Sequence, residues 1–182
     1  EQGAPIYISD PATVIGPDDP GLTEPHVGMQ AYLTAFVPLI PSGNQYVDVR
    51  DVAEVHLRLL QQQPAAGRYL VGGHYLKWPQ LADLLEELTQ RRLLKIPATG
   101  GFMRLAGKTL DRVREHLPVA IPMSEEAMDY ATRWVPMDNS LVESTLDVSF
   151  RSVEDSMRDT IRWLYDAGHI EKRHAGAALQ SR

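Results

Sequence analysis

The sequence has no cysteine among its 182 residues. This absence excludes a disulfide framework, a thiolate nucleophile and a cysteine-based zinc site. Long apolar runs are also missing: the stretch 35–40 is interrupted by Pro38, and a membrane span needs roughly 20 apolar residues. The first residues, 1–3, lack the basic and apolar regions of a signal peptide. We therefore expect a cytoplasmic protein that does not enter a membrane.

Positively charged residues are fewer than negatively charged ones, with 18 Lys and Arg against 24 Asp and Glu, which gives a net charge of −6. Nucleic acids bind clustered Lys and Arg, so this balance argues against a nucleic-acid partner. The six histidines show neither H-x-x-x-H nor H-E-x-x-H spacing, and no metal site is expected. With 43% hydrophobic and 23% charged residues, the composition is that of a globular protein with a substantial core.

The first elements read as a buried strand over 5–8, a loop over 10–25 rich in proline and glycine, and a helix over 28–37. The loop is the longest irregular segment, and such loops often carry function. Asp18 and Asp19 lie in it among turn residues, so they are interpreted as turn formers. Because the chain starts without methionine and enters a strand almost at once, we expect it to be cut from a longer one.

Residues 45–49 alternate polar and apolar side chains and predict a half-buried strand, followed by a helix and a further strand over 68–73. Asp51 is the predicted N-cap of that helix, and Glu54 lies three residues later, where its side chain can bond back to the N-cap backbone. Asp48 and Asp51 flank Arg50, and neither is interpreted as catalytic. The predicted buried side of the helix consists of Val52, Ala53, Val55, Leu59 and Leu60.

Four later helices are predicted: one starting near Pro79 with leucines at 81, 84, 85 and 88 on one face, and others over 102–117, 124–134 and 152–167. The last has a Ser152 cap and Gly168 at its end. Residues 171–182 predict an exposed tail, or a segment that is helical only through contacts. The sequence thus predicts an α/β fold, mostly helical, with two or three strands.

The segment containing Pro11, Val14, Gly16 and Pro17 after a strand resembles the one that follows the sixth strand of extended short-chain dehydrogenases/reductases. Residues 46–53 are similar to the next strand-to-helix element of this family, residues 68–73 to its next strand, and residues 150–168 to its closing helix. Within the family the chain looks most like epimerase/dehydratase and dihydroflavonol-reductase-like members. The resemblance implies the C-terminal strands of a Rossmann-type sheet and a helical substrate-binding lobe over residues 1–170, with the nucleotide-binding half absent.

The catalytic features of that family are missing from this sequence. There is no G-x-G-x-x-G spacing, and none of the seven tyrosines has a lysine four residues later. We therefore expect no catalytic residue in this chain, no activity and no bound cofactor for the chain alone, and NAD or NADP in the full-length protein. An exposed apolar surface is expected where the missing N-terminal half would dock.

The resemblance also implies site residues. The segment matching Pro11, Thr13 and Val14 lies against the nicotinamide in relatives, and its backbone can bond the carboxamide. His26, Met29, Leu33 and Gln45 fall where relatives build the substrate pocket.

The implied function is that of an NAD(P)-dependent oxidoreductase acting on a carbonyl or alcohol, with a small-molecule substrate and the missing half as partners. Two alternatives stay open: a nucleotide-sugar epimerase or dehydratase, and a non-catalytic binding module derived from this fold. The stretch 18–29 has no lysine or arginine to hold a diphosphate, which favours a smaller or more apolar substrate. The oligomeric state is left open.

Overall fold

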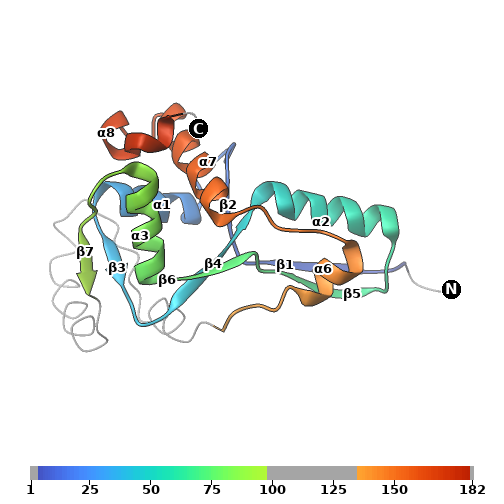
Figure 1. Ribbon diagram of the computed structural model, residues 1–182. Helices are drawn as coiled ribbons and strands as arrows, with labels where there is room; N and C mark the ends of the chain where they lie inside the picture. The colour runs from blue at the N-terminus through green and yellow to red at the C-terminus, as the bar shows by residue number, and fades with distance from the viewer. Residues whose placement is uncertain (1–3, 98–134, 181–182) are drawn as a thin grey trace, which may run out of the picture.

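The computed structural model describes residues 4–97 and 135–180, which form an elongated molecule with a core at each end (Figure 1). The strands and helices of the first 97 residues are β1 (Tyr7–Pro11), β2 (Thr13–Ile15), α1 (Glu24–Thr34), β3 (Val37–Leu39), β4 (Gly43–Asp48), α2 (Val49–Gln62), β5 (Gly67–Val71), β6 (His74–Lys77), α3 (Trp78–Thr89) and β7 (Lys95–Pro97). The later ones are α6 (Ser140–Leu146), α7 (Val153–Asp166), α8 (Lys172–Ala175) and the 3₁₀ turn η2 (Gly176–Leu179).

The strands of the described residues form three small sheets. β1 pairs with β5 in parallel, β2 pairs with β4 in parallel while β6 joins β4 antiparallel, and β3 pairs with β7 in parallel. β4 runs from one end of the molecule toward the other, where α2 lies beside β1, β5 and α6 (Figure 1). The predicted strands are present with shifted bounds, whereas β2, β3, β6 and β7 were not predicted.

The first correction concerns the loop predicted over residues 10–25. β1 continues to Pro11 and β2 occupies 13–15, so the irregular segment begins only at Gly16. The helix predicted over 28–37 instead spans Glu24–Thr34, because Pro25 is tolerated in a first helical turn and the chain re-enters a strand at Val37.

The second correction concerns the start of α2. Asp48, not Asp51, is the N-cap: its backbone is extended and its carboxylate accepts a hydrogen bond from the Arg50 N–H at 2.9 Å. The strand therefore ends one residue before the helix begins, and Asp51 falls in the first turn. β4 is also largely buried, where a half-buried strand was predicted.

The face that α2 buries is narrower than predicted. Val55 and Leu59 are 0% and 3% exposed, but Leu60 is 70% exposed and Ala53 is exposed as well. The helix has a second apolar stripe, formed by Val49, Ala53, Leu57 and Leu60, which is exposed to a large extent and most of all at Leu60.

Two helices confirm their predictions closely. In α3 the predicted leucines at 81, 84, 85 and 88 are all buried. In α7 the Ser152 hydroxyl accepts from the Asp155 N–H at 3.1 Å, and Gly168 has a φ of +78° just after the helix. The helices predicted over 102–117 and 124–134 lie outside the described residues.

Of the two alternatives predicted for residues 171–182, the described part agrees with the segment that is helical through its contacts. α8 and η2 pack against α3 and α7, and Ala175 and Ala178 are 0% and 1% exposed. Arg162 Nε donates to the carbonyl of Ala178 at 2.7 Å, which fixes the segment to α7. Small side chains allow this close approach, so the segment is helical through its contacts.

The larger core lies between α1, α3 and α7 and includes Met29, Leu85 and Ile161. The smaller core lies between α2, α6 and β5, with Val55, Val71 and Leu146 fully buried. No helix in the described parts of the chain is long and apolar enough to cross a membrane.

Candidate functional site

The segment from Pro11 to Ile15 is where the chain passes from one sheet to another. The Ala12 N–H still donates to the carbonyl of Val71 in β5 at 3.0 Å, and Thr13 then pairs with Tyr46 of β4. The Thr13 hydroxyl donates to Asn44 Oδ1 at 3.1 Å, which fastens the crossing to β4. The predicted cofactor residues Pro11, Thr13 and Val14 therefore lie on one continuous strand-like stretch.

One edge of this stretch has no partner strand among the described residues. The carbonyl of Ile6 accepts from Gly67 and the N–H of Ala12 donates to Val71, so even-numbered residues direct their backbone groups toward β5. Backbone groups alternate in direction along a strand, and those of Tyr7, Ser9 and Pro11 therefore point to the open edge.

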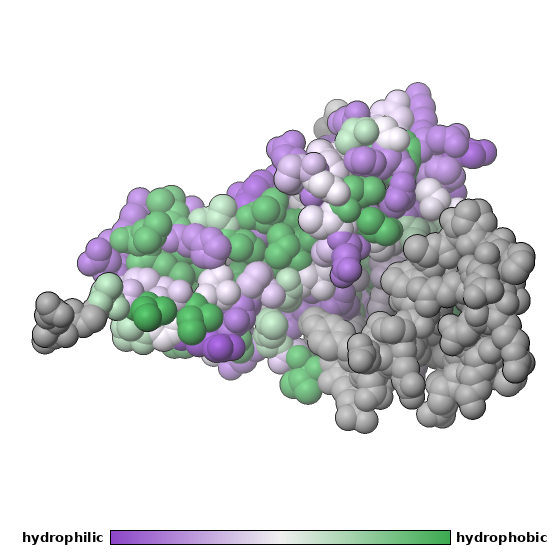
Figure 2. All heavy atoms as spheres, turned by 180° about the vertical axis from the view of Figure 1, so that it is seen from behind, coloured by the Kyte–Doolittle hydropathy of each residue, from purple (hydrophilic) through white to green (hydrophobic). Residues whose placement is uncertain are grey.

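The sheet formed by β1 and β5 is also open on one face. Ile8 lies opposite Arg68 on the side away from the buried Tyr69 and Val71. Ile6 is 71% and Ile8 42% exposed, and Figure 2 shows apolar side chains gathered over the end of the molecule that holds α2, β1 and β5. An exposed apolar surface of the predicted kind is thus present.

The turn after the crossing is fixed by a buried histidine and aspartate. His26, 4% exposed, has Nε2 at 2.8 Å from the carbonyl of Gly16 and Nδ1 at 2.8 Å from Asp19 Oδ2. Both neighbours can only accept, so both contacts are hydrogen bonds only when both ring nitrogens carry hydrogen. The ring also stands edge-on to Trp163 of α7 at 5.1 Å, so the turn is clamped to the helical core.

Asp19 is the centre of that turn. Its carboxylate accepts from the N–H and the hydroxyl of Thr23, both at 2.7 Å, and from the Gly21 N–H at 3.1 Å. Burial opposes ionisation of Asp19, but these hydrogen bonds together with His26 outweigh it and lower the pKa of the carboxyl below its usual 3.8. The interpretation of Asp19 as a turn former agrees with these contacts.

The predicted substrate residues are buried within the chain. His26, Met29 and Leu33 lie on the inner face of α1 and are at most 4% exposed. Gln45 is 2% exposed; its Nε2 donates to the carbonyl of Met137 at 3.1 Å and its Oε1 accepts from the Met137 N–H at 2.7 Å. Their role toward a substrate stays a prediction.

Gln45 lies in a tightly packed junction. A Cβ on Gly72 would lie 2.3 Å from Gln45 Nε2, and the Gly72 N–H donates to Asn139 Oδ1 at 2.8 Å. Asn139 in turn donates to the carbonyl of Gly73 at 2.8 Å. These contacts fasten the segment before α6 across the ends of β4 and β5.

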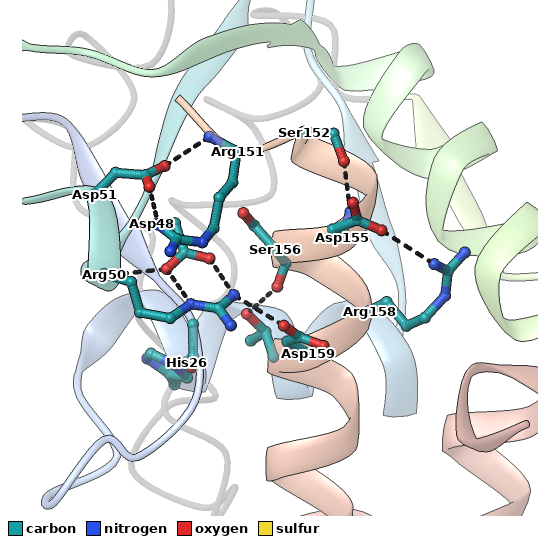
Figure 3. A network of polar contacts seen from close by, with 12 residues as sticks. His26, Asp48, Arg50, Asp51, Arg151, Ser152, Asp155, Ser156, Arg158 and Asp159 are labelled. Atoms are coloured by element: carbon teal, nitrogen blue, oxygen red, sulfur yellow. Dashed lines mark hydrogen bonds and ion pairs between the residues drawn. The ribbon is translucent and has the colours of Figure 1, made fainter. Parts of the chain in front are cut away.

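A cluster of arginines and aspartates was missed by the sequence analysis. Arg50 is paired with Asp48 and Asp159, and Arg151 with Asp51 (Figure 3). The local signal was Arg50 between two aspartates, but its partners in and before α7 are about a hundred residues away in the chain. In the described ranges, no group of three His, Cys, Asp or Glu is arranged to hold a metal ion.

The chain is similar in structure to known enzymes. No family model matches the chain. Its structure is similar to that of PA4631, a nucleoside-diphosphate-sugar epimerase from Pseudomonas aeruginosa, with a TM-score of 0.72 and 21% identity over 93% of this chain and 51% of that chain. It is also similar to vestitone reductase from alfalfa, with a TM-score of 0.57 and 17% identity over 87% of this chain and 44% of that one. The chain therefore has the fold of about half of each of these two proteins.

In sequence, the chain is similar to cinnamoyl-CoA reductase 1 of Arabidopsis thaliana. It is 26% identical over 172 residues, which cover 93% of this chain and 42% of that protein. Together these similarities confirm the resemblance to extended short-chain dehydrogenases/reductases. The chain spans about half the length of the proteins it matches or less.

Proposed function

We propose that this chain is the C-terminal, substrate-binding part of an NAD(P)-dependent oxidoreductase that reduces or oxidises a carbonyl or alcohol substrate. Hydride transfer would depend on an upstream half that carries the glycine fingerprint and the tyrosine and lysine absent here. The observation that carries the proposal is the unfinished sheet formed by β1 and β5.

That sheet has only two strands among the described residues, fewer than a stable parallel sheet needs. Parallel strands are normally covered on both faces and supported by further strands, and a two-stranded sheet alone is marginally stable. Among the described residues no strand pairs with the second edge of β1, and Ile6 and Ile8 lie exposed on this strand. Leu57 and Leu60 of α2 are 46% and 70% exposed. Strands and a helix from an upstream half would cover these groups.

The open edge also fits the proposed cofactor contact. A nicotinamide carboxamide needs one hydrogen-bond acceptor and one donor. The Pro11 carbonyl points to the open edge and supplies the acceptor, while proline has no N–H, so the donor must come from Thr13 or Val14. When bound, the dinucleotide would accept or donate the hydride.

A nucleotide-sugar epimerase or dehydratase is the second candidate, favoured by the similarity to the solved epimerase. The absence of lysine and arginine from residues 18–29 favours the reductase instead, as does the reductase named in the sequence comparison. A binding module that lost its nucleotide domain is the third.

The test is dinucleotide binding by the protein encoded by the complete reading frame. We expect that protein to bind NADH or NADPH in fluorescence and calorimetric titrations, and the present chain to bind neither. A complete protein that binds neither dinucleotide would refute the proposal and favour the binding module. Turnover of a nucleotide sugar without net oxidation of added cofactor would select the epimerase.

A further inference from the structure

A cavity of about 430 Å³ lies on the surface between the start of α2 and the first half of α7. It is separate from the strand crossing, and its walls carry an unusual concentration of guanidinium groups: Arg50, Arg151, Arg158 and Arg162, with Ser152, Asp155 and Asp159. Figure 3 shows the side chains that meet around it. The volume lies in the range of small-molecule pockets, about 300–1,000 Å³.

The side chain of Arg50 is held in place by two aspartates. Its Nε and one Nη donate to the two oxygens of Asp48 at 2.8 and 2.6 Å, and the same Nη donates to Asp159 at 2.8 Å. The side chain of Asp48 is fully buried, so this bidentate pair fixes the plane of the guanidinium. The other Nη has no hydrogen bond to any described residue and is available at the cavity.

Two further arginines are anchored in the same way. Asp51, 5% exposed, accepts from the backbone N–H of Arg151 at 2.8 Å and from its guanidinium. Arg162 donates to the carbonyls of Ala178 and Gln180, both at 2.7 Å. Each contact uses part of the five donors of a guanidinium. The cavity is therefore lined by positioned cations with unused donors.

Arg158 is the least constrained of the set. Among the described contacts its only side-chain partner is Asp155, at 3.3 Å, which is at the long end of a hydrogen bond. Its side chain is nevertheless only 17% exposed. A ligand can thus recruit this guanidinium without breaking a strong ion pair.

The hydrogen-bond donors of the walls favour an anion. The four arginines are balanced by four aspartates once Asp48 and Asp51 are counted, so the attraction comes from unused guanidinium N–H groups and not from an excess of positive charge. α7 has 14 residues and begins next to Ser152, so the partial positive charge of its N-terminus adds to the field. Guanidinium groups match the oxygens of a phosphate in geometry as well as in charge.

We propose that this cavity binds a small phosphorylated sugar or polyol. The guanidinium groups would hold the phosphate, and the remaining carboxylate oxygens of Asp155 and Asp159 would accept from hydroxyl groups. The same carboxylates repel an extended polyanion, so a nucleic acid is not a suitable ligand. This inference does not depend on the proposed oxidoreductase function.

The test uses the chain itself, with ribose 5-phosphate as the probe and ribose as the uncharged control, followed by NMR titration of backbone amides. We expect saturable binding of ribose 5-phosphate at about millimolar concentration or below, no binding of ribose, and shifts centred on residues 151–159. Shifts centred elsewhere, or no saturation, would overturn the proposal. Binding of inorganic phosphate as tight as that of ribose 5-phosphate would overturn its sugar part.

Arg158→Gln should weaken binding about tenfold, because it removes one charge-assisted contact. Arg173→Gln is the matched control, since Arg173 is exposed, is paired with Glu171 and does not line the cavity; binding should stay within about twofold. Arg158→Lys should bind with intermediate strength, which separates loss of charge from loss of folding. Equal affinities for Arg158→Gln and Arg173→Gln would contradict the proposal.

Discussion

Replacing Gln45 by alanine should destabilise the chain even with no substrate present. The side-chain amide of Gln45 makes two hydrogen bonds to the backbone of Met137, at 3.1 and 2.7 Å, and is 2% exposed. A hydrogen bond of this kind contributes about 1 kcal/mol net. Losing both should therefore lower the free energy of unfolding by about 2 kcal/mol.

The assay is urea unfolding followed by tryptophan fluorescence. Gln61→Ala is the matched control, because Gln61 is an exposed residue of α2; its effect should stay within about 0.5 kcal/mol. If Gln45→Ala unfolds at the same urea concentration as the unchanged chain, the contacts with Met137 do not stabilise it. Gln45 would then be left with the substrate role that the family resemblance implies.

Three further substitutions test the interior of the site. Asp51→Ala should lower the free energy of unfolding in urea by about 2 kcal/mol, because the carboxylate accepts two hydrogen bonds from Arg151. Asp51→Asn should lower it by less, and a variant as stable as the unchanged chain would contradict this. The lowered pKa of Asp19 means that its ionised form stabilises the fold, so stability is present above pH 3.8 and lost as the pH falls further. Asp19→Asn should flatten this acid limb, and an unchanged limb would argue against it. Gly73→Ala should lower the free energy of unfolding by at least about 2 kcal/mol, because φ is +64° and a Cβ would lie 2.2 Å from the Tyr46 carbonyl oxygen. Gly21→Ala is the control, because a Cβ there would meet nothing within 4 Å. Similar urea midpoints for the two variants would contradict the predicted strain at Gly73.

The local elements were predictable where one signal dominated. The leucine spacing of α3 and the Ser152 cap of α7 each pointed to one structure, and both helices are present. The start of α2 was not predictable in the same way, because Asp48 and Asp51 are both suitable N-caps. Asp48 is the N-cap because β4, through its pairing with β2 and β6, extends as far as this residue.

The site was predictable only in part. The pattern of Pro11, Val14 and Gly16 pointed to the segment after β1 as a site. It predicted neither the crossing between sheets nor the open edge beside it, which follow from strand pairing with β5 and β4. The pairing of Arg151 with Asp51 joins residues 100 positions apart. Such contacts depend on tertiary packing and have no local signal in the sequence.

The most direct test of the central claim is amide hydrogen exchange of Tyr7 and Ser9, whose N–H groups point to the open edge of β1. In the chain alone these two amides should exchange rapidly, whereas those of Ile8 and Asp10 should be slower, because they point toward β5. In the protein encoded by the complete reading frame, Tyr7 and Ser9 should become protected, because an added strand would accept from them. Rapid exchange of both amides in the complete protein would contradict the account.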